Sequence, residues 1–220
     1  MDSTSSCEVN HSIIMNYFFL DIASHDGLLA CISSNGVISS REVSTRIRDH
    51  ELIPLVEECL KEAKWEYQDL DRIACVIGPG GFTSLRVAVS FSNTLMDQLD
   101  IEGAGIHLSD LYFARVCRGE HCRTMTGDGV PSFDRAQDDT LYWIHSTKKD
   151  SLFIKGGKWE ETTLITTDEI PKDGLWMGEV ISPVELKEAQ LKPVKEILPE
   201  FIKNLSYSKK PLEPWYGRSG

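Results

Sequence analysis

The chain has 220 residues, of which 41% are hydrophobic and 26% are charged. Its 34 acidic residues exceed its 23 basic residues, which gives a formal net charge of −11 at pH 7. This hydrophobic content supports a buried core in one large or two small domains. The acidic balance excludes a protein that binds nucleic acid backbones on its own, because such proteins carry clustered positive charge.

The N-terminal segment MDSTSSCEVNHSII has neither a basic region nor a long apolar run, so it does not resemble a secretory signal. No stretch approaches the roughly 20 apolar residues of a membrane helix, which predicts a cytoplasmic protein without membrane contact. Residues 1–14 show no hydrophobic period and are predicted to be a disordered leader, with Met15 as an alternative start. Order is expected to begin at Tyr17.

Two patterns follow one another between Tyr17 and residue 64. Segments 17–22, 28–33 and 37–43 are rich in β-forming residues and are separated by turn residues, which predicts a three-stranded meander. The apolar spacing then changes to 3.6 residues, which predicts an amphipathic helix over 53–64 with Pro54 near its start. Its buried face is expected to comprise Leu52, Ile53, Leu55, Val56, Cys59, Leu60 and Ala63.

A buried strand over 72–78 and a helix over 83–100 are predicted next, joined by a glycine-rich turn. The buried face of this helix is expected to comprise Leu85, Ala88, Val89, Phe91, Leu95, Met96 and Leu99. Its opposite face is expected to carry Thr83, Arg86, Ser90, Asn93, Thr94 and Asp97. The order of strands and helices predicts a mixed α/β layer structure.

The pattern is weaker beyond residue 103. A helix capped by Ser109 is expected over 107–117, followed by a polar loop over 118–140. A weak helix is expected over 193–205. Strands are expected over 140–146, 151–157, 158–166 and 174–180, the first two as a hairpin.

The stretch CVIGPGGFTSLRV at 75–87 places three glycines, Gly78, Gly80 and Gly81, between a strand and a helix. Such turns can bind phosphate, because backbone N–H groups and the helix N-terminus face the anion. A P-loop also requires a lysine, and none occurs in 75–87, while the dinucleotide fingerprint requires glycine where Thr83 stands. The sequence favours a structural turn with Thr83 as the helix cap, and phosphate contact through Arg86 is the alternative.

The six cysteines are scattered, and a cytoplasmic protein is expected to keep them reduced. Cys117, His121 and Cys122, with His107 as a fourth ligand, could form a metal site. Structural zinc sites normally have two close cysteine pairs, however, and only one is present. The sequence therefore favours a polar loop and predicts no metal or other cofactor.

The segment GPGGFTSLRV is similar to the GPGSFTGLRIG signature of the TsaB (YeaZ) family, the partner subunits of the bacterial machinery that makes tRNA N6-threonylcarbamoyladenosine. FLDIASHDGLLACISSNG resembles the opening strand and hairpin of that family, and DHELIPLVEECLKEA resembles its first helix. LYWIHSTKKDSLFI resembles its second-domain hairpin, and LEPWYGR its C-terminal ending. The resemblance covers most of 15–220 except 118–140. It implies an actin-like ASKHA fold (acetate kinase, Hsp70, actin; ribonuclease H-like) with sub-domains at 15–106 and 107–220.

The resemblance also bears on activity. Nucleotide-binding relatives of this fold end the first strand in Asp-x-Gly-x-Thr/Ser, whereas this chain has Asp21, Ile22, Ala23 and Ser24, with a methyl group where glycine would let the backbone approach an oxyanion. Catalytic relatives carry an HxxxH metal motif, and no two histidines here stand four apart. The loop is therefore expected to be a remnant of a nucleotide site, made of Asp21, Ser24, Gly78, Gly80 and Gly81.

The resemblance implies a non-catalytic subunit that binds and activates a TsaD-like transferase, with a TsaE-like ATPase as third member, tRNA contacted only through the complex, and a homodimer possible when alone. Small polar residues allow close helix approach, so the partner interface is expected at Arg86, Ser90, Asn93, Thr94 and Asp97, with His50 on the flanking helix. The alternatives are a small ASKHA phosphotransferase, a glycoprotease-like hydrolase and a self-associating scaffold.

Overall fold

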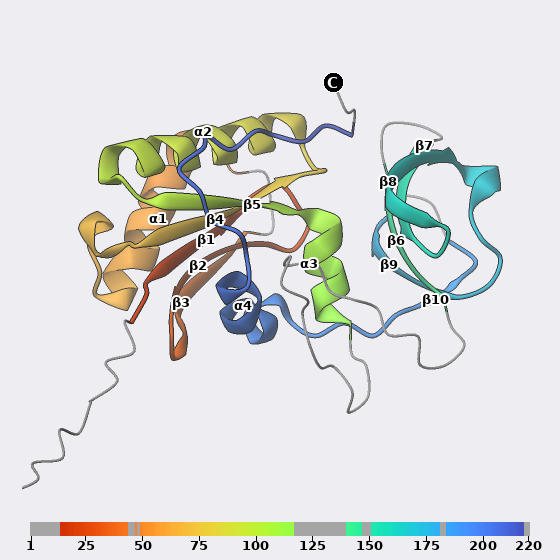
Figure 1. Ribbon diagram of the computed structural model, residues 1–220, viewed down its shortest axis with the longest axis horizontal. Coiled ribbons are helices and arrows are strands. Elements are labelled where there is room, and N and C mark those ends of the chain that lie inside the picture. The colour runs from red at the N-terminus through yellow and green to blue at the C-terminus, as the bar shows by residue number, and fades with distance from the viewer. Residues whose placement is uncertain are drawn as a thin grey trace, which may run out of the picture.

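The computed structural model describes residues 14–43, 47, 49–116, 140–146, 151–180 and 184–217. It contains two five-stranded sheets, each at the centre of one sub-domain (Figure 1). The predicted mixed α/β architecture is confirmed. All but the last residue of the predicted leader and nearly all of the 118–140 loop, with Cys117, His121 and Cys122, lie outside the described residues. No helix in the described part of the chain is long and apolar enough to cross a membrane.

The first sheet has the strand order β3-β2-β1-β4-β5. β1 (Tyr17–Asp21), β2 (Gly27–Ser33) and β3 (Gly36–Val43) form the predicted antiparallel meander. β4 (Arg72–Gly78), which was also predicted, pairs parallel with β1. β5 (Glu102–His107), which was not predicted, pairs parallel with β4.

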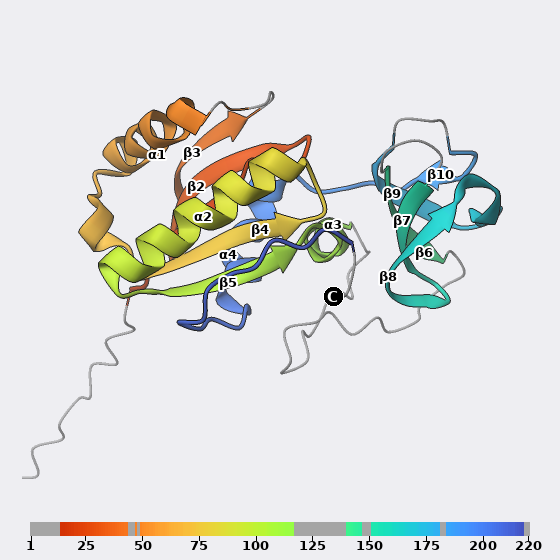
Figure 2. The ribbon, with the colours of Figure 1, turned by 90° about the horizontal axis from the view of Figure 1, so that it is seen from above.

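Two helices, α1 (Asp49–Ala63) and α2 (Phe82–Leu99), cover one face of this sheet (Figure 2). Alternate strand residues such as Phe18 and Cys31 point toward them, as the two-residue period of a strand requires. α1 begins at Asp49, four residues before its expected start. A short 3-10 helix, η1 (Tyr67–Asp69), follows α1. The expected burial of Ile53 is wrong, because its side chain is 51% exposed at the edge of the apolar arc.

The other face of the first sheet is covered by α3 (Leu108–Arg115) and α4 (Val194–Lys203). α4 contacts β2 and β3, and Ser208 forms a backbone bridge with Gly103 on β5. The chain therefore returns from the second sheet to the first, although the sequence placed all of 107–220 in the second sub-domain. The boundary expected at residue 106 remains a prediction.

The second sheet has the order β10-β9-β6-β7-β8. β6 and β7 form the predicted antiparallel hairpin, β8 extends it, and β9 pairs parallel with β6. A 3-10 helix, η2 (Thr167–Glu169), follows β8. The sheet packs against α3 through Trp143, Phe153 and Met177. The strands are β6 (Leu141–Ser146), β7 (Ser151–Gly156), β8 (Trp159–Thr166), β9 (Leu175–Glu179) and β10 (Lys187–Glu188).

Both helix caps expected from the sequence are wrong. The N-cap of α2 is Gly81, and Thr83 lies one position inside the first turn. The N-cap of α3 is His107, and Ser109 is fully buried with no hydrogen-bond partner for its hydroxyl among the described residues. Each helix thus begins before the polar residue that was expected to start it.

Candidate functional site

The glycine turn, residues 78–81, joins the end of β4 to the start of α2. Because β1 and β4 are parallel neighbours, this turn lies beside the loop that follows β1. The amide of Gly81 donates a hydrogen bond to the carbonyl oxygen of Ala23, 3.3 Å away. A Cβ atom on Gly80 would lie 2.7 Å from the same oxygen. The two loops therefore meet backbone to backbone, and this contact requires glycine at position 80.

The C-terminal segment, residues 212–216, packs on the other side of the glycine turn and runs along α2 (Figure 1). The amide of Trp215 donates to the carbonyl oxygen of Ile77 at 2.8 Å, and a Cβ atom on Gly78 would overlap the carbonyl oxygen of Trp215. The Asn93 amide group donates to the oxygen of Leu212 at 3.0 Å and accepts from its N–H at 2.7 Å. The segment thus occupies space next to the turn that a ligand would otherwise reach.

Asp21, at the end of β1, is buried, and its carboxylate is occupied by its own loop. One oxygen accepts the amides of Ala23 at 3.0 Å and Ser24 at 3.1 Å, and the Ser24 hydroxyl donates to the other oxygen. Burial raises the pKa of Asp21 above its usual range, although these hydrogen bonds oppose the shift. The sequence grouped Asp21 and Ser24 with the three glycines, and the structure brings all five to the same edge of the sheet.

A polar cluster that the sequence did not predict joins the two sub-domains. Glu179, at the end of β9, accepts hydrogen bonds from the amide of His25 at 2.8 Å and from the Tyr112 hydroxyl at 3.2 Å. His145 on β6 places Nδ1 3.8 Å from the other Glu179 oxygen. Burial raises the pKa of Glu179 and lowers the pKa of His145 to about 4. The sequence signal that could have identified His145 and Glu179 is an ionisable residue within, or at the end of, an apolar strand.

Two ion pairs lie close to this junction. Arg115 on α3 contacts Asp26 at 3.2 Å, and Lys155 on β7 contacts Asp110 on α3 at 2.7 Å. The second pair borders a pocket of about 310 Å³ between the sub-domains, which His107 and Trp215 also line. His107, considered above as a metal ligand, packs edge-on against Trp215, and their ring centroids are 5.2 Å apart. Among the described residues, no group of three His, Cys, Asp or Glu side chains is arranged to hold a metal ion.

The residues predicted to form the partner interface fall into two groups. Arg86, Ser90, Thr94 and Asp97 are exposed along α2, and His50 is exposed near the start of α1. Asn93 is half-buried and holds the C-terminal segment, so its side chain faces the protein's own chain.

One aromatic residue on this surface was missed. Phe82, at the start of α2, is 60% exposed. Its ring lies 4.9 Å from that of Tyr216, and the Arg86 guanidinium lies 5.5 Å from its centroid. We call the following set the α1–α2 outer face: His50, Ile53, Phe82, Arg86, Ser90, Thr94 and Asp97.

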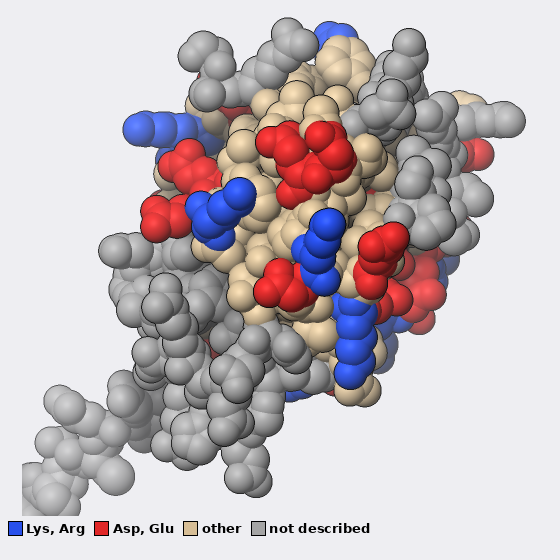
Figure 3. All heavy atoms as spheres, turned by 90° about the vertical axis from the view of Figure 1, so that its right-hand side faces the viewer, with Lys and Arg blue, Asp and Glu red and all other residues tan. Residues whose placement is uncertain are grey.

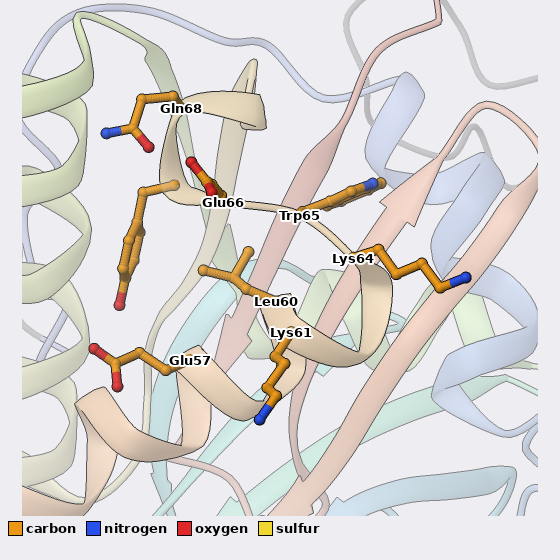
Figure 4. Close-up of a pocket in the computed structure, with 8 residues that line it drawn as sticks. Glu57, Leu60, Lys61, Lys64, Trp65, Glu66 and Gln68 are labelled. Atoms are coloured by element: carbon orange, nitrogen blue, oxygen red, sulfur yellow. The ribbon is translucent and has the colours of Figure 1, made fainter.

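An open groove lies at the C-terminal end of α1, beside η1 (Figure 4). Leu60 and Tyr67 line it together with Trp65, and Lys61 and Glu57 project from α1 at its rim. None of the predicted site residues lines this groove.

Comparison with known proteins gives two kinds of sequence match. The family model of TsaD, described as tRNA N6-adenosine threonylcarbamoyltransferase, matches residues 35–121. The tRNA threonylcarbamoyladenosine biosynthesis protein TsaB of Buchnera aphidicola subsp. Acyrthosiphon pisum is 25% identical over 154 residues, or 70% of this chain and 54% of that protein. A tRNA N6-adenosine threonylcarbamoyltransferase of Cytophaga hutchinsonii is 38% identical over 60 residues, or 27% of this chain and 18% of that enzyme. The chain thus spans about half the length of the TsaB relative.

The fold also matches a solved structure. YeaZ from Pseudomonas aeruginosa superposes with a TM-score of 0.64 at 15% identity, covering 91% of this chain and 99% of that chain. At this identity the likeness concerns the fold alone, and it is consistent with the predicted α/β fold of the ASKHA type with two sub-domains. The TsaB sequence match agrees with the glycine-turn signature, so the chain is similar in sequence to a TsaB protein and in fold to YeaZ.

Proposed function

We propose that this protein takes part in making tRNA N6-threonylcarbamoyladenosine, as a non-catalytic subunit that binds and activates a TsaD-like transferase. The similarity to a TsaB biosynthesis protein and to TsaD-type transferases supports the pathway and the partner. A role in tRNA modification also agrees with the cytoplasmic location that the sequence predicts.

The observation that carries the non-catalytic role is the contact between Gly81 and Ala23. In a phosphate-binding turn the N–H groups at a helix N-terminus remain free to face an anion. Here the N–H of Gly81, the N-cap of α2, donates to a protein carbonyl. The Asp21 carboxylate is likewise occupied by its own loop. This arrangement favours a turn that positions α2 over one that binds nucleotide.

The α1–α2 outer face is the surface we assign to the transferase. It combines an exposed aromatic ring and an arginine, Phe82 and Arg86, with the short side chains of Ser90 and Thr94. Aromatic and arginine side chains dominate binding energy at protein interfaces, and short side chains let two helices approach closely. A second copy of the chain could occupy the same face when the transferase is absent.

We assign tRNA contact to the assembled complex. The net charge of −11 disfavours binding of an RNA backbone by this chain alone. On the face of the second sub-domain shown in Figure 3, basic and acidic side chains are interspersed among uncharged residues. A TsaE-like ATPase is the third member that the family resemblance implies.

Co-expression with a TsaD-like transferase tests this proposal. The two proteins should co-purify as a complex, and tRNA should be modified when both are present with the remaining components and not when either is omitted. Modification at an undiminished rate without this chain would contradict the proposal. ATP turnover by the purified chain alone would instead favour the phosphotransferase alternative.

A further inference from the structure

Two cysteines contact each other in the core of the first sub-domain. Cys31 lies on β2 and Cys59 on α1; both side chains are fully buried free thiols, and their Sγ atoms are 3.8 Å apart. We propose that Cys31 and Cys59 form a reversible disulfide when the protein meets hydrogen peroxide, which ties α1 to β2. This inference goes beyond the proposed function and does not depend on it.

The environment of Cys59 is polar as well as buried. The Cys31 thiol donates toward Cys59 Sγ, and Ser39 Oγ on β3 lies 3.3 Å from the same sulfur. The Ser39 hydroxyl also donates to the Cys59 carbonyl oxygen at 2.6 Å, which fixes its position. Hydrogen bonding from Cys31 lowers the pKa of the Cys59 thiol, and the same interaction raises the pKa of Cys31. Cys59 is therefore the sulfur that ionises more readily and attacks first.

The chemistry balances with hydrogen peroxide as the oxidant. The Cys59 thiolate attacks one peroxide oxygen, so that an S–O bond forms, the O–O bond breaks and hydroxide leaves. Cys31 then attacks the resulting sulfenic sulfur, so that the S–S bond forms, the S–O bond breaks and water leaves with the Cys31 proton. Two thiols lose two electrons in total, and one peroxide becomes two molecules of water.

The geometry requires only a small movement. A disulfide has an S–S distance of about 2.05 Å, so the two sulfurs must approach by roughly 2 Å from 3.8 Å. Side-chain rotation together with a slight shift of α1 toward the sheet supplies such a change. Both residues already belong to one hydrophobic cluster, so α1 and β2 keep their packing while the sulfurs approach.

Cys75 provides an internal comparison. It is also a buried free thiol, but it lies on β4, which is separated from β2 by β1. Strands are about 4.8 Å apart, so roughly 10 Å of sheet separates Cys75 from Cys31. Cysteines whose Cα atoms are more than about 7 Å apart cannot be bridged without backbone movement. The native fold therefore favours the pairing of Cys31 with Cys59 over a bridge between Cys31 and Cys75.

The disulfide would act on the helix that carries part of the α1–α2 outer face. Cys59 is fully buried on α1, whereas His50 and Ile53 are exposed on the same helix. A covalent bond from α1 to β2 would restrict the movement of this helix relative to the sheet. Disulfides in intracellular proteins are usually transient, which fits a reversible oxidation.

The test uses a variant in which Cys7, Cys117 and Cys122, which lie outside the described residues, are replaced by Ser. The folded protein is treated with hydrogen peroxide, the remaining thiols are blocked under denaturing conditions, and disulfide-linked peptides are identified by mass spectrometry. We expect the Cys31–Cys59 peptide to exceed any pairing with Cys75 by at least about tenfold, since contact raises effective concentration. Dithiothreitol should reverse it, and Cys75→Ser should leave it unchanged.

The same treatment in guanidinium is the control for geometry, because the unfolded chain should give mixed pairings. The proposal is overturned if the folded protein keeps all three thiols free under conditions that oxidise the unfolded chain. It is also overturned if the folded protein gives the same mixture of pairings as the unfolded chain.

Discussion

The backbone amide of Gly81 donates a hydrogen bond to the carbonyl oxygen of Ala23, and the two atoms are 3.3 Å apart. This bond connects the loops that follow β1 and β4, which end side by side at one edge of the first sheet. In open α/β sheets, ligands bind at the carboxyl ends of neighbouring strands. In this protein the loop after β1 and the C-terminal segment occupy that position, through Ala23 on one side and Trp215 on the other.

We expect Gly78→Ala to destabilise the protein more than Gly36→Ala. The two glycines have nearly the same φ, +133° and +130°, so a side chain is strained at both. A Cβ atom at position 78 also overlaps the Trp215 carbonyl oxygen, whereas position 36 has no atom within 4 Å. Overlap in a packed region costs about 1–3 kcal/mol beyond the φ strain. Urea unfolding of both variants measures the difference in their unfolding free energies. Equal losses of stability would show that the Trp215 carbonyl does not restrict the space at position 78.

We expect Asn93→Ala to loosen the C-terminal segment. The substitution removes two hydrogen bonds to the backbone of Leu212, which should cost about 1–3 kcal/mol. Hydrogen exchange at the amides of Leu212 and Trp215 should then become faster. Thr94→Ala is the matched control, because Thr94 is exposed on the same helix and, within the described part of the chain, its hydroxyl bonds to the carbonyl oxygen of Ser90 alone. Unchanged exchange in Asn93→Ala would mean that other contacts hold the segment.

His145 should make stability depend on pH between about 4 and 6.5. Burial lowers its pKa from 6.5 to about 4, so between these values the unfolded chain binds a proton that the folded protein does not. Its contribution is fully present above pH 6.5 and is lost as the pH falls toward 4. The shift corresponds to about 3 kcal/mol at most.

The neighbouring carboxyl groups make stability depend on pH in the opposite direction. Burial raises the pKa values of Glu179 and Asp21, so their contributions are largest at low pH and are lost as the pH rises through the raised values. The measurement is therefore the difference in unfolding free energy between wild type and His145→Gln from pH 4 to 7, with exposed His50→Gln as control. A difference that is constant across this range would contradict the account of His145.

The purified chain should not hydrolyse ATP above the rate of a buffer control. The N–H of Gly81 and both oxygens of Asp21 are bonded to the protein itself, so these groups are not available to stabilise phosphoryl charge. The measurement is phosphate release by wild type and Asp21→Asn. Turnover by wild type that Asp21→Asn abolishes would establish a phosphotransferase-type site. Weak nucleotide binding without turnover is compatible with the proposal.

The sequence predicted most strands and helices because their hydrophobic periods are strong, but it missed β5. That strand contains Gly103 and Gly105, where neighbouring groups leave no room for a side chain. A Cβ on Gly103 would be 2.9 Å from Cε of Met96, and one on Gly105 would be 3.0 Å from Cδ1 of Ile77. Glycine is depleted in strands, so local preference was misleading here.

The site was predictable only where it is local in sequence. The loop at Asp21 and the glycine turn were identified from their motifs. The roles of Asn93 and Glu179 depend on partners 119 and 154 residues away, and no local pattern contains this information. Phe82 was missed because it lies in the glycine-turn signature, and nothing in that pattern indicates whether its aromatic side chain is exposed.

The central claim is that the α1–α2 outer face binds the TsaD-like transferase. The most direct measurement is calorimetric titration of the transferase with wild type, Ser90→Arg, Phe82→Ala and Leu164→Ala, with circular dichroism as the folding control. Leu164 on β8 is 56% exposed, close to the 60% of Phe82, but lies in the other sub-domain. We expect Ser90→Arg and Phe82→Ala to weaken binding by about 2–4 and 1–3 kcal/mol, because they place a charge in, or remove an aromatic ring from, a desolvated contact. Leu164→Ala should bind as wild type does. Unchanged affinity of folded Ser90→Arg and Phe82→Ala would contradict the account and place the interface elsewhere.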